Sequence, residues 1–243
     1  MRWFYGVIAT VFALLVWQAI VSFSGLPKFI LPGPLLVAET WWENKELIFE
    51  HATITAIEVV LGLIIGALLG IITAIQLAAF KSARLLVQPI LVFTQALPVF
   101  ALAPILTLWF GYGLWSKIAM AVLIIYFPVT SAFLDGLQRT PSGFLDLANT
   151  MQARSARVLL YIKIPAALPS LASGLRLAAV YAPIGAVIGE WVGASRGLGY
   201  LMLLANGRAK TDLMFAALIT LGIFSILLHT LVVKTTQNLG KGS

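Results

Sequence analysis

Six long apolar runs constrain what this chain can fold into. They cover about residues 3–23, 53–80, 85–110, 116–137, 168–192 and 213–233, more than half of the 243 residues. A helix needs about 20 apolar residues to cross the hydrocarbon core of a bilayer, and each run reaches that length. The sequence therefore predicts an all-α, polytopic membrane protein with about six transmembrane helices, forming one transmembrane domain over residues 1–243.

The composition excludes the soluble classes of protein. Apolar residues make up 60% of the chain and charged residues only 10%, whereas soluble domains average about 25% charged residues. A soluble domain could not cover so much apolar surface. This excludes an ordinary soluble enzyme, a disordered chain and a nucleic-acid-binding domain, so the expected surroundings are membrane lipid. There is no cysteine, which also excludes disulfides and cysteine-based metal sites.

The basic residues set the expected orientation. With six spans, both termini lie on the same side of the membrane. Ten basic residues fall on that side, and six, including Lys117, fall on the opposite side. Loops that stay in the cytoplasm carry an excess of lysine and arginine. We therefore expect a multi-pass protein of the plasma membrane with both termini in the cytoplasm.

The third run is interrupted by Pro89, Pro98 and Pro104. Proline removes a backbone donor and bends a helix, and such breaks persist in a membrane only where protein or a water-filled cavity satisfies the freed carbonyls. This run is the best candidate for lining a translocation path. Polar residues inside apolar spans are a second indication of such a path. The path residues we expect are Gln95, Thr94, Pro98, Tyr126, Thr130, Tyr181 and Glu190, with Glu58, Gln76 and Ser131 in a wider set.

Each of these residues also has a simpler interpretation. Gln95 could form a hydrogen bond between helices, and the tyrosines could simply pack. Glu58 lies near the end of its span, where its carboxyl group could reach water. His51 and His229 are far apart and not in metal-binding spacing, so interfacial positions are expected. Glycines four residues apart, at 62, 66 and 70, predict close packing of one helix face.

Two segments outside the spans are long enough to fold. Residues 31–52 on the external side predict a turn followed by an amphipathic helix at the membrane interface. On the cytoplasmic side, residues 139–169 contain a short helix whose apolar face holds Phe144, Leu147, Ala148 and Met151, at i, i+3, i+4 and i+7. That helix is too short to cross a bilayer, so it either lies along the membrane or docks on a protein, and the pattern favours neither.

The same loop carries a resemblance to a known family. Asp146-Leu147-Ala148, then Gln152-Ala153, then the run from Ile164 to Pro169 resemble the signature loop of permease subunits of bacterial ABC importers: an acidic residue and two alanines, a glycine, then an apolar residue and proline. Leu147 replaces the first alanine of that pattern, and Gln152 replaces the glycine that allows a tight bend.

The resemblance extends over nearly the whole chain. It is closest to the nitrate, sulfonate and taurine type of importer permease. The segments that carry it are Pro98 to Gly111, Gly174 to Ala178, Gly197 to Leu201 and Thr211-Asp212. Within that type, the segments 189–193, 205–208 and 214–215 look most like permeases for the hydroxymethylpyrimidine precursor of thiamine.

The resemblance implies a type I ABC importer permease fold with a cytoplasmic coupling helix. It implies a homodimer of permeases, two ATP-binding cassette subunits and an external solute-binding protein. ATP and Mg would be bound by the partner ATPase, and this chain would contribute no cofactor, metal or catalytic residue. It also has no phosphate-binding loop sequence. The expected ATPase-docking residues are Phe144, Asp146, Leu147, Ala148, Asn149, Thr150, Met151, Gln152, Ala153 and Arg154.

The expected function is transport, not catalysis. The resemblance implies a permease that moves a small polar solute into the cytoplasm by alternating access, with a thiamine-precursor pyrimidine as the first choice. The alternatives are an alkanesulfonate, taurine, nitrate or another small solute in the same architecture. An ion-driven secondary transporter is a remote alternative, because such proteins usually have more spans and coupling residues inside the membrane.

Overall fold

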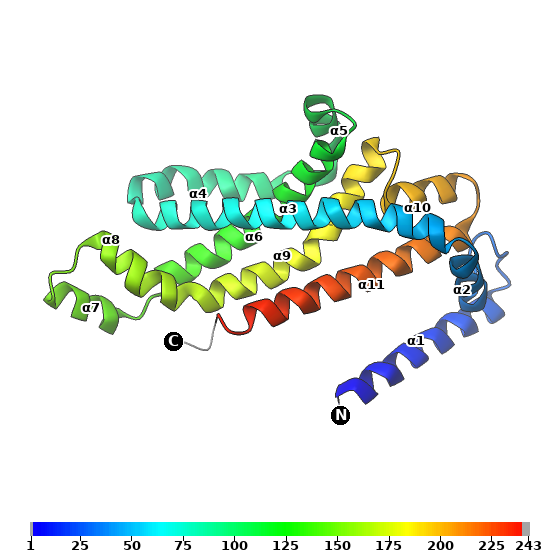
Figure 1. Ribbon diagram of the computed structural model, residues 1–243, viewed down its shortest axis with the longest axis horizontal. Coiled ribbons are helices and arrows are strands. Elements are labelled where there is room, and N and C mark those ends of the chain that lie inside the picture. Colours follow the sequence, from blue (N-terminus) through cyan, green and yellow to red (C-terminus); the bar gives the residue numbers. More distant parts are fainter. Residues whose placement is uncertain (1, 240–243) are drawn as a thin grey trace.

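Long apolar helices form almost the whole architecture (Figure 1). The computed structural model describes residues 2–239, and every regular element in that range is helical. The helices long and apolar enough to cross a membrane are α1 (Arg2–Ser24), α3 (Lys45–Ala79), α6 (Leu114–Gln138), the α8–α9 segment and α11 (Thr211–Thr236). With the bent pair α4 (Lys81–Ala96) and α5 (Val99–Phe110) they make six. The number of spans expected from the apolar runs is thus confirmed. Lys241, one of the basic residues counted above, lies outside the described residues.

The remaining elements are short and lie at the two ends of the bundle (Figure 1). One end carries α7 (Ser142–Thr150), α8 (Ser155–Val158) and a π-helical turn, Leu159–Lys163, which leads into α9 (Ile164–Gly193). Because α9 begins at Ile164, the last residues of the predicted loop, 164–169, are already helical. The other end carries α2 (Pro34–Glu43) and α10 (Leu198–Gly207). We refer to them as the α7 end and the α10 end.

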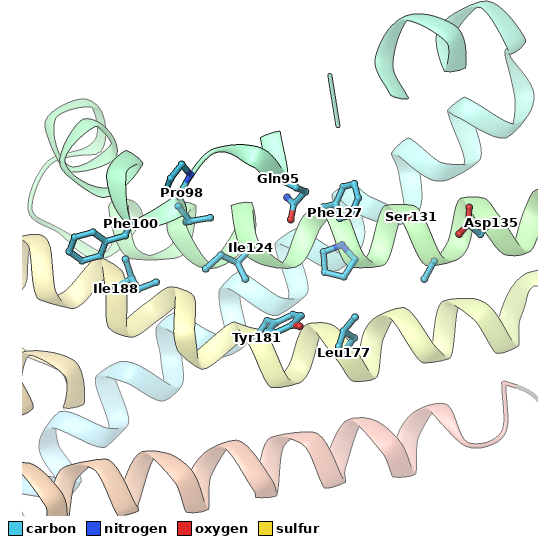
Figure 2. A pocket seen from close by; sticks show the side chains of 13 residues that line it. Gln95, Pro98, Phe100, Ile124, Phe127, Ser131, Asp135, Leu177, Tyr181 and Ile188 are labelled. Atoms are coloured by element: carbon cyan, nitrogen blue, oxygen red, sulfur yellow. The ribbon is translucent and has the colours of Figure 1, made fainter. Parts of the chain in front are cut away.

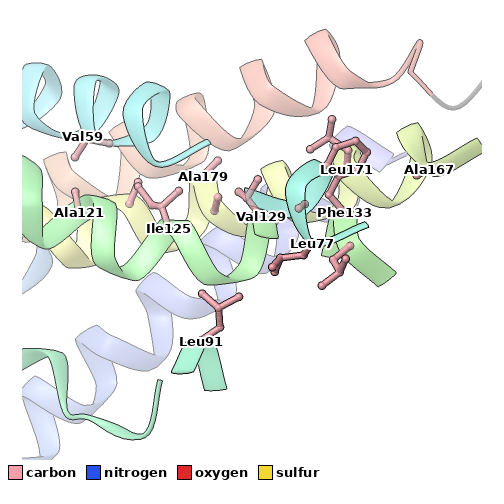
Figure 3. Packing of buried hydrophobic residues seen from close by; sticks show 14 of the residues in the cluster. Val59, Leu77, Leu91, Ala121, Ile125, Val129, Phe133, Ala167, Leu171 and Ala179 are labelled. Atoms are coloured by element: carbon pink, nitrogen blue, oxygen red, sulfur yellow. The ribbon is translucent and has the colours of Figure 1, made fainter. Parts of the chain in front are cut away.

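The core lies where α3, α6 and α9 pack together (Figure 3). Gly62, Gly66 and Gly70 form the face of α3 that meets α6, as the spacing predicts. A Cβ atom added at Gly62 would lie 2.5 Å from the Ala121 Cβ, and one at Gly66 would lie 3.0 Å from Ile125. The absence of side chains on this face therefore lets the two helices approach closely.

The break predicted in the third run falls at a single proline. Pro98 is the N-cap of α5, and the axes of α4 and α5 differ by 101° there. Pro89 and Pro104 both lie inside helices. Of the three prolines, only Pro98 lies at the bend between the two helices.

Segment 31–52 contains α2 and the first turns of α3. Pro34 occupies the first turn of α2, and Val37 and Thr40 are buried. The Trp41 indole donates to the Thr220 hydroxyl at 2.9 Å, and the Lys45 ammonium lies 4.1 Å from the centre of the Trp42 ring. Trp17 of α1 stacks on Phe215 of α11, with ring centres 5.7 Å apart. These aromatic contacts connect α1 and α2 to the rest of the bundle.

Candidate functional site

A pocket of about 700 Å³ lies beside the break between α4 and α5 (Figure 2). Gln95 and Pro98 line it at the break, and α9 contributes Leu177, Tyr181 and Ile188. Six residues of α6 line the pocket along the length of that helix: Ile124, Phe127, Pro128, Ser131, Ala132 and Asp135. These positions repeat every three or four residues, so they share one face of the helix.

The polar members of the pocket are few. Gln95, Tyr181 and Asp135 are exposed, and Ser131 is half-buried. Figure 2 shows Gln95, Phe127 and Tyr181 in the middle of the pocket and Asp135 at the end nearer α7. The rest of the lining is mainly apolar or aromatic. Such a surface, with a few polar groups for orientation, is typical of a small-molecule site.

Three of the predicted path residues line this pocket, namely Gln95, Pro98 and Tyr181. The other four do not. Thr94 and Thr130 donate to backbone carbonyls of their own helices, at 2.7 Å in both cases. The Tyr126 hydroxyl donates to Thr73 at 3.0 Å, across the α3–α6 contact.

Glu190 is the fourth predicted path residue that does not line the pocket. It lies at the α10 end and is 1% exposed. One of its carboxylate oxygens accepts the Thr55 hydroxyl at 2.6 Å. The other accepts the backbone N–H groups of Gly199 and Tyr200, at the start of α10. Glu190 of α9 thus anchors the first turn of α10.

Two residues of α3 complete this anchor. The Thr55 hydroxyl accepts the Leu198 N–H at 2.8 Å, and the His51 Nδ1 accepts the Gly197 N–H at 2.9 Å. Gly197 has φ +112°, and a side chain there would strike the Glu190 carboxyl group. The first N–H groups of a helix lack partners inside the helix, and at α10 they are satisfied by side chains from α3 and α9.

The structure corrects two expectations near this anchor. The His51 side chain is buried within the chain, near the start of α3. Glu58 is 3% exposed and does not reach water, and its Oε2 has no hydrogen-bond partner among the described residues. Lys117 is not a loop charge: it is 2% exposed, and its ammonium donates to the carbonyls of Tyr112 at 2.6 Å and Gly193 at 2.7 Å. Hydropathy could not reveal these positions, because burial of a charged group depends on partners distant in sequence.

The expected docking residues form α7 and the turn that follows it. Phe144 is 56% exposed, Leu147 59% and Met151 73%, and they line a groove of about 330 Å³ with residues of the following segment. Ala148, the fourth member of the predicted apolar face, is 3% exposed and packs inward. The other predicted docking residues are exposed, except that Ala153 is half-buried. The large apolar side chains of Phe144, Leu147 and Met151 thus remain uncovered at the α7 end of the bundle.

The turn after α7 explains the departure at Gln152. Gln152 has φ +52°, in the left-handed region that favours glycine. The Ala153 N–H donates to the Ala148 carbonyl and the Gln152 N–H to the Asn149 carbonyl, both at 2.9 Å. This is the Schellman pattern that ends many helices. Gln152 therefore adopts the bend that glycine provides in the resembling loops.

The described residues, 2–239, contain no group of three side chains able to hold a metal ion. What this arrangement can do is bind a small solute beside a broken helix and present an apolar surface at the α7 end.

Comparisons with known proteins agree with this arrangement. Residues 66–239 match the family model described as "Binding-protein-dependent transport system inner membrane component". A probable ABC transporter permease protein of Haemophilus influenzae is 51% identical over 89% of this chain and 88% of the relative. The formylaminopyrimidine transport permease protein ThiX of Halalkalibacterium halodurans is 36% identical, covering 88% of this chain and 86% of the relative. The taurine transport system permease protein TauC of Escherichia coli is 28% identical over 89% and 81%.

Solved structures share the fold. A chain of the MetNI methionine ABC transporter, in an inward-facing conformation, aligns with a TM-score of 0.62 at 18% identity, over 82% of this chain and 96% of that one. A chain of an amino acid ABC transporter with histidines aligns with a TM-score of 0.65 at 15% identity, over 83% and 96%. The all-α importer-permease fold expected from the sequence is thereby confirmed.

Proposed function

The chain belongs to the family of binding-protein-dependent transport system inner membrane components, and from this we propose that it carries a thiamine-precursor pyrimidine into the cytoplasm. Members of this family are membrane-spanning permease subunits of ABC importers, and they are not enzymes. ATP hydrolysis occurs on a separate subunit.

The choice of solute is supported mainly by one comparison. The relative named for formylaminopyrimidine is 36% identical to this chain, and so is a relative from Chloroflexus aurantiacus named for riboflavin, whereas the relative named for taurine is 28% identical. The identities therefore favour a nitrogen heterocycle over a sulfonate, and the pyrimidine is the smaller of the two heterocycles. The pocket supports the same choice, because Tyr181 and Phe127 offer aromatic faces to a planar ring and Gln95 offers an amide to its edge. A sulfonate, taurine or nitrate in the same architecture is the alternative that the experiment below distinguishes.

The α7 surface is the proposed docking site for the ATPase. Phe144, Leu147 and Met151 would fill an apolar groove on that subunit, as an amphipathic helix does in helix-in-groove recognition. Asp146 and Arg154 are exposed beside them and would fix the register. ATP and Mg would be held by the ATPase alone. Because ATP is cytoplasmic, this assignment places the α7 end and both termini in the cytoplasm, in agreement with the distribution of basic residues.

Transport would use two copies of the permease. ATP binding would bring the two ATPase subunits together, and α7 would transmit that movement to α6 and α9. ATP then acts as a ligand that favours one of two conformations. The break at Pro98 supports this account, because an irregular backbone at membrane depth is tolerated only where it lines a cavity or is buried in protein. The solute would pass along the pocket between α4, α5, α6 and α9.

Purification of the tagged chain from its native membranes tests the proposal. Mass spectrometry of the bound proteins should find an ATP-binding cassette subunit, and a solute-binding protein carrying a pyrimidine. The variant Leu147→Arg should lose the ATPase while inserting normally, because Leu147 is exposed and its replacement disturbs no core contact. A sulfonate on the binding protein would refute the proposed solute, and equal ATPase recovery with Leu147→Arg would refute the docking site.

A further inference from the structure

Among the residues that the structure describes, Asp135 is the one acidic residue that lines the pocket, and no basic residue of that range lines it. It lies in the last turn of α6 and is exposed, one turn beyond Ser131 on the same face of the helix. Asp135 lies near the end of its span, whereas polar residues in the middle of an apolar run are the ones that indicate a translocation path from sequence.

The nearest basic residues do not enter the pocket. Arg176 lies on α9, one residue before Leu177 of the lining, but its side chain turns away and donates to the Thr236 hydroxyl of α11 at 3.0 Å. Arg139 follows Asp135 by one helical turn, beyond the end of α6, and is not among the lining residues. The charge that a solute meets in this pocket is therefore negative.

A single charge has a large effect in such surroundings. The lining is mostly apolar, and the interaction between two charges is several times stronger near a protein surface or interior than in bulk water. A carboxylate accepts hydrogen bonds and donates none. It repels a sulfonate or nitrate and attracts a solute that carries N–H donors or positive charge. Repulsion of the wrong solute is as effective a source of selectivity as attraction of the right one.

We propose that Asp135 is a specificity-determining residue of the translocation path. It accepts hydrogen bonds from the amino group or protonated ring nitrogen of a nitrogen heterocycle, and it excludes organic anions. The inference rests on the proposed function and deepens it, because it defines the solute class by charge. Asp135 lies at the α7 end of the pocket, so a solute that enters beside Gln95 and Tyr181 meets it last (Figure 2). Ser131, one turn earlier, supplies a second hydrogen-bonding group for the same solute.

Direct binding separates this selectivity from that of the solute-binding protein. The permease–ATPase complex in lipid nanodiscs, without the binding protein, is titrated with radiolabelled taurine and with a hydroxymethylpyrimidine that bears an exocyclic amino group. The variants are Asp135→Asn, which removes the charge and keeps the shape, and Asp135→Lys, which reverses the charge. Glu39→Gln is the matched control, since Glu39 is an exposed carboxylate at the α10 end.

The wild-type complex should bind the pyrimidine at least tenfold more tightly than taurine. Asp135→Asn should weaken pyrimidine binding about tenfold, the loss expected for a hydrogen bond to a charged group, and Asp135→Lys should reverse the preference. Glu39→Gln should match the wild type. Unchanged affinities and unchanged ATP-driven pyrimidine uptake in both Asp135 variants would overturn the inference. Failure of the wild-type complex, supplied with its binding protein, to take up the pyrimidine would instead overturn the proposed solute.

Discussion

Replacement of Glu190 by glutamine should loosen the start of α10 without unfolding the bundle. The carboxylate accepts three hydrogen bonds, from Thr55, Gly199 and Tyr200. Glutamine keeps the shape but has one acceptor oxygen instead of two. If that oxygen stays on the two N–H groups of α10, the amide nitrogen faces Thr55. The Thr55 hydroxyl can then donate only to the His51 carbonyl, at 3.3 Å.

The expected loss is the change in the free energy needed to detach the start of α10 from the bundle. Glu190 stays inside the bundle when α10 detaches, so the cost of burying its charge is common to both states. The difference is the loss of one charge-assisted hydrogen bond, about 1.5–3 kcal/mol, and of the favourable interaction of a carboxylate with a helix N-terminus, up to about 2 kcal/mol when partly buried. We expect a loss of about 3 kcal/mol, which corresponds to roughly 100-fold faster exchange where opening and closing are fast compared with exchange of the open amide.

Hydrogen exchange of the backbone amides of residues 198–200 measures this opening. Exchange there should rise about 100-fold in Glu190→Gln, while amides in the middle of α3 and α6 keep their protection. Glu39→Gln, an exposed carboxylate on α2, should leave both regions unchanged. A rise of less than threefold at residues 198–200 would refute the view that Glu190 anchors α10.

Substitutions at Gln152, Gly62 and Lys117 test other parts of the structure, each by thermal unfolding in detergent. Gln152→Gly should leave the free energy of unfolding unchanged or raise it by up to about 1 kcal/mol, because glycine adopts the left-handed backbone conformation of this position without steric strain. Gln152→Val should lower the free energy of unfolding, because a β-branched side chain is strained there. Gly62→Ala should lower the free energy of unfolding by about 1–3 kcal/mol, because the added Cβ would lie 2.5 Å from the Ala121 Cβ. Gly222→Ala, which meets nothing within 4 Å, is its control. Lys117→Met should lower the free energy of unfolding by about 3 kcal/mol, because the Tyr112 and Gly193 carbonyls lose their charged donor. An unchanged unfolding midpoint would refute that role.

The sequence predicts most of the architecture because the membrane imposes it. A span must be long, apolar and helical, so the six runs and the break at Pro98 could be located by length and composition. The apolar face of α7 could be found from its helical period, and the close contact of α3 with α6 from the glycine spacing. These features are local in sequence, and local patterns are what hydropathy and periodicity report.

The features that escaped prediction depend on contacts between distant segments. The Glu190 anchor joins residues 51, 55 and 190 to the segment 197–200, and no pattern within one helix indicates it. Lys117 counts as a loop charge in sequence, but the fold directs it to carbonyls at the ends of two other segments. Asp135 was overlooked for a related reason: its importance depends on which face of α6 lines the pocket, and that is decided by the packing of α9 and the break beside Gln95.

The anchor and the pocket share helix α9. A side chain at Gly193, near the end of α9, would meet Thr107 and Tyr112 around the end of α5. The Lys117 ammonium of α6 donates to the carbonyls of Tyr112 and Gly193 and so joins these segments. The pocket lining therefore shares α9 with the contacts that anchor α10, and it shares α6 and α9 with the Lys117 contacts. A movement of α9 that opens one end of the path would change both.

Uptake by purified components tests the central claim most directly. Proteoliposomes that contain this chain and its ATPase, supplied with the solute-binding protein outside and ATP inside, should accumulate the labelled aminopyrimidine. Accumulation should stop when ATP is replaced by a non-hydrolysable analogue or when Leu147→Arg replaces the wild-type chain. Uptake that persists without ATP hydrolysis and follows an imposed ion gradient would contradict the account and favour an ion-driven transporter.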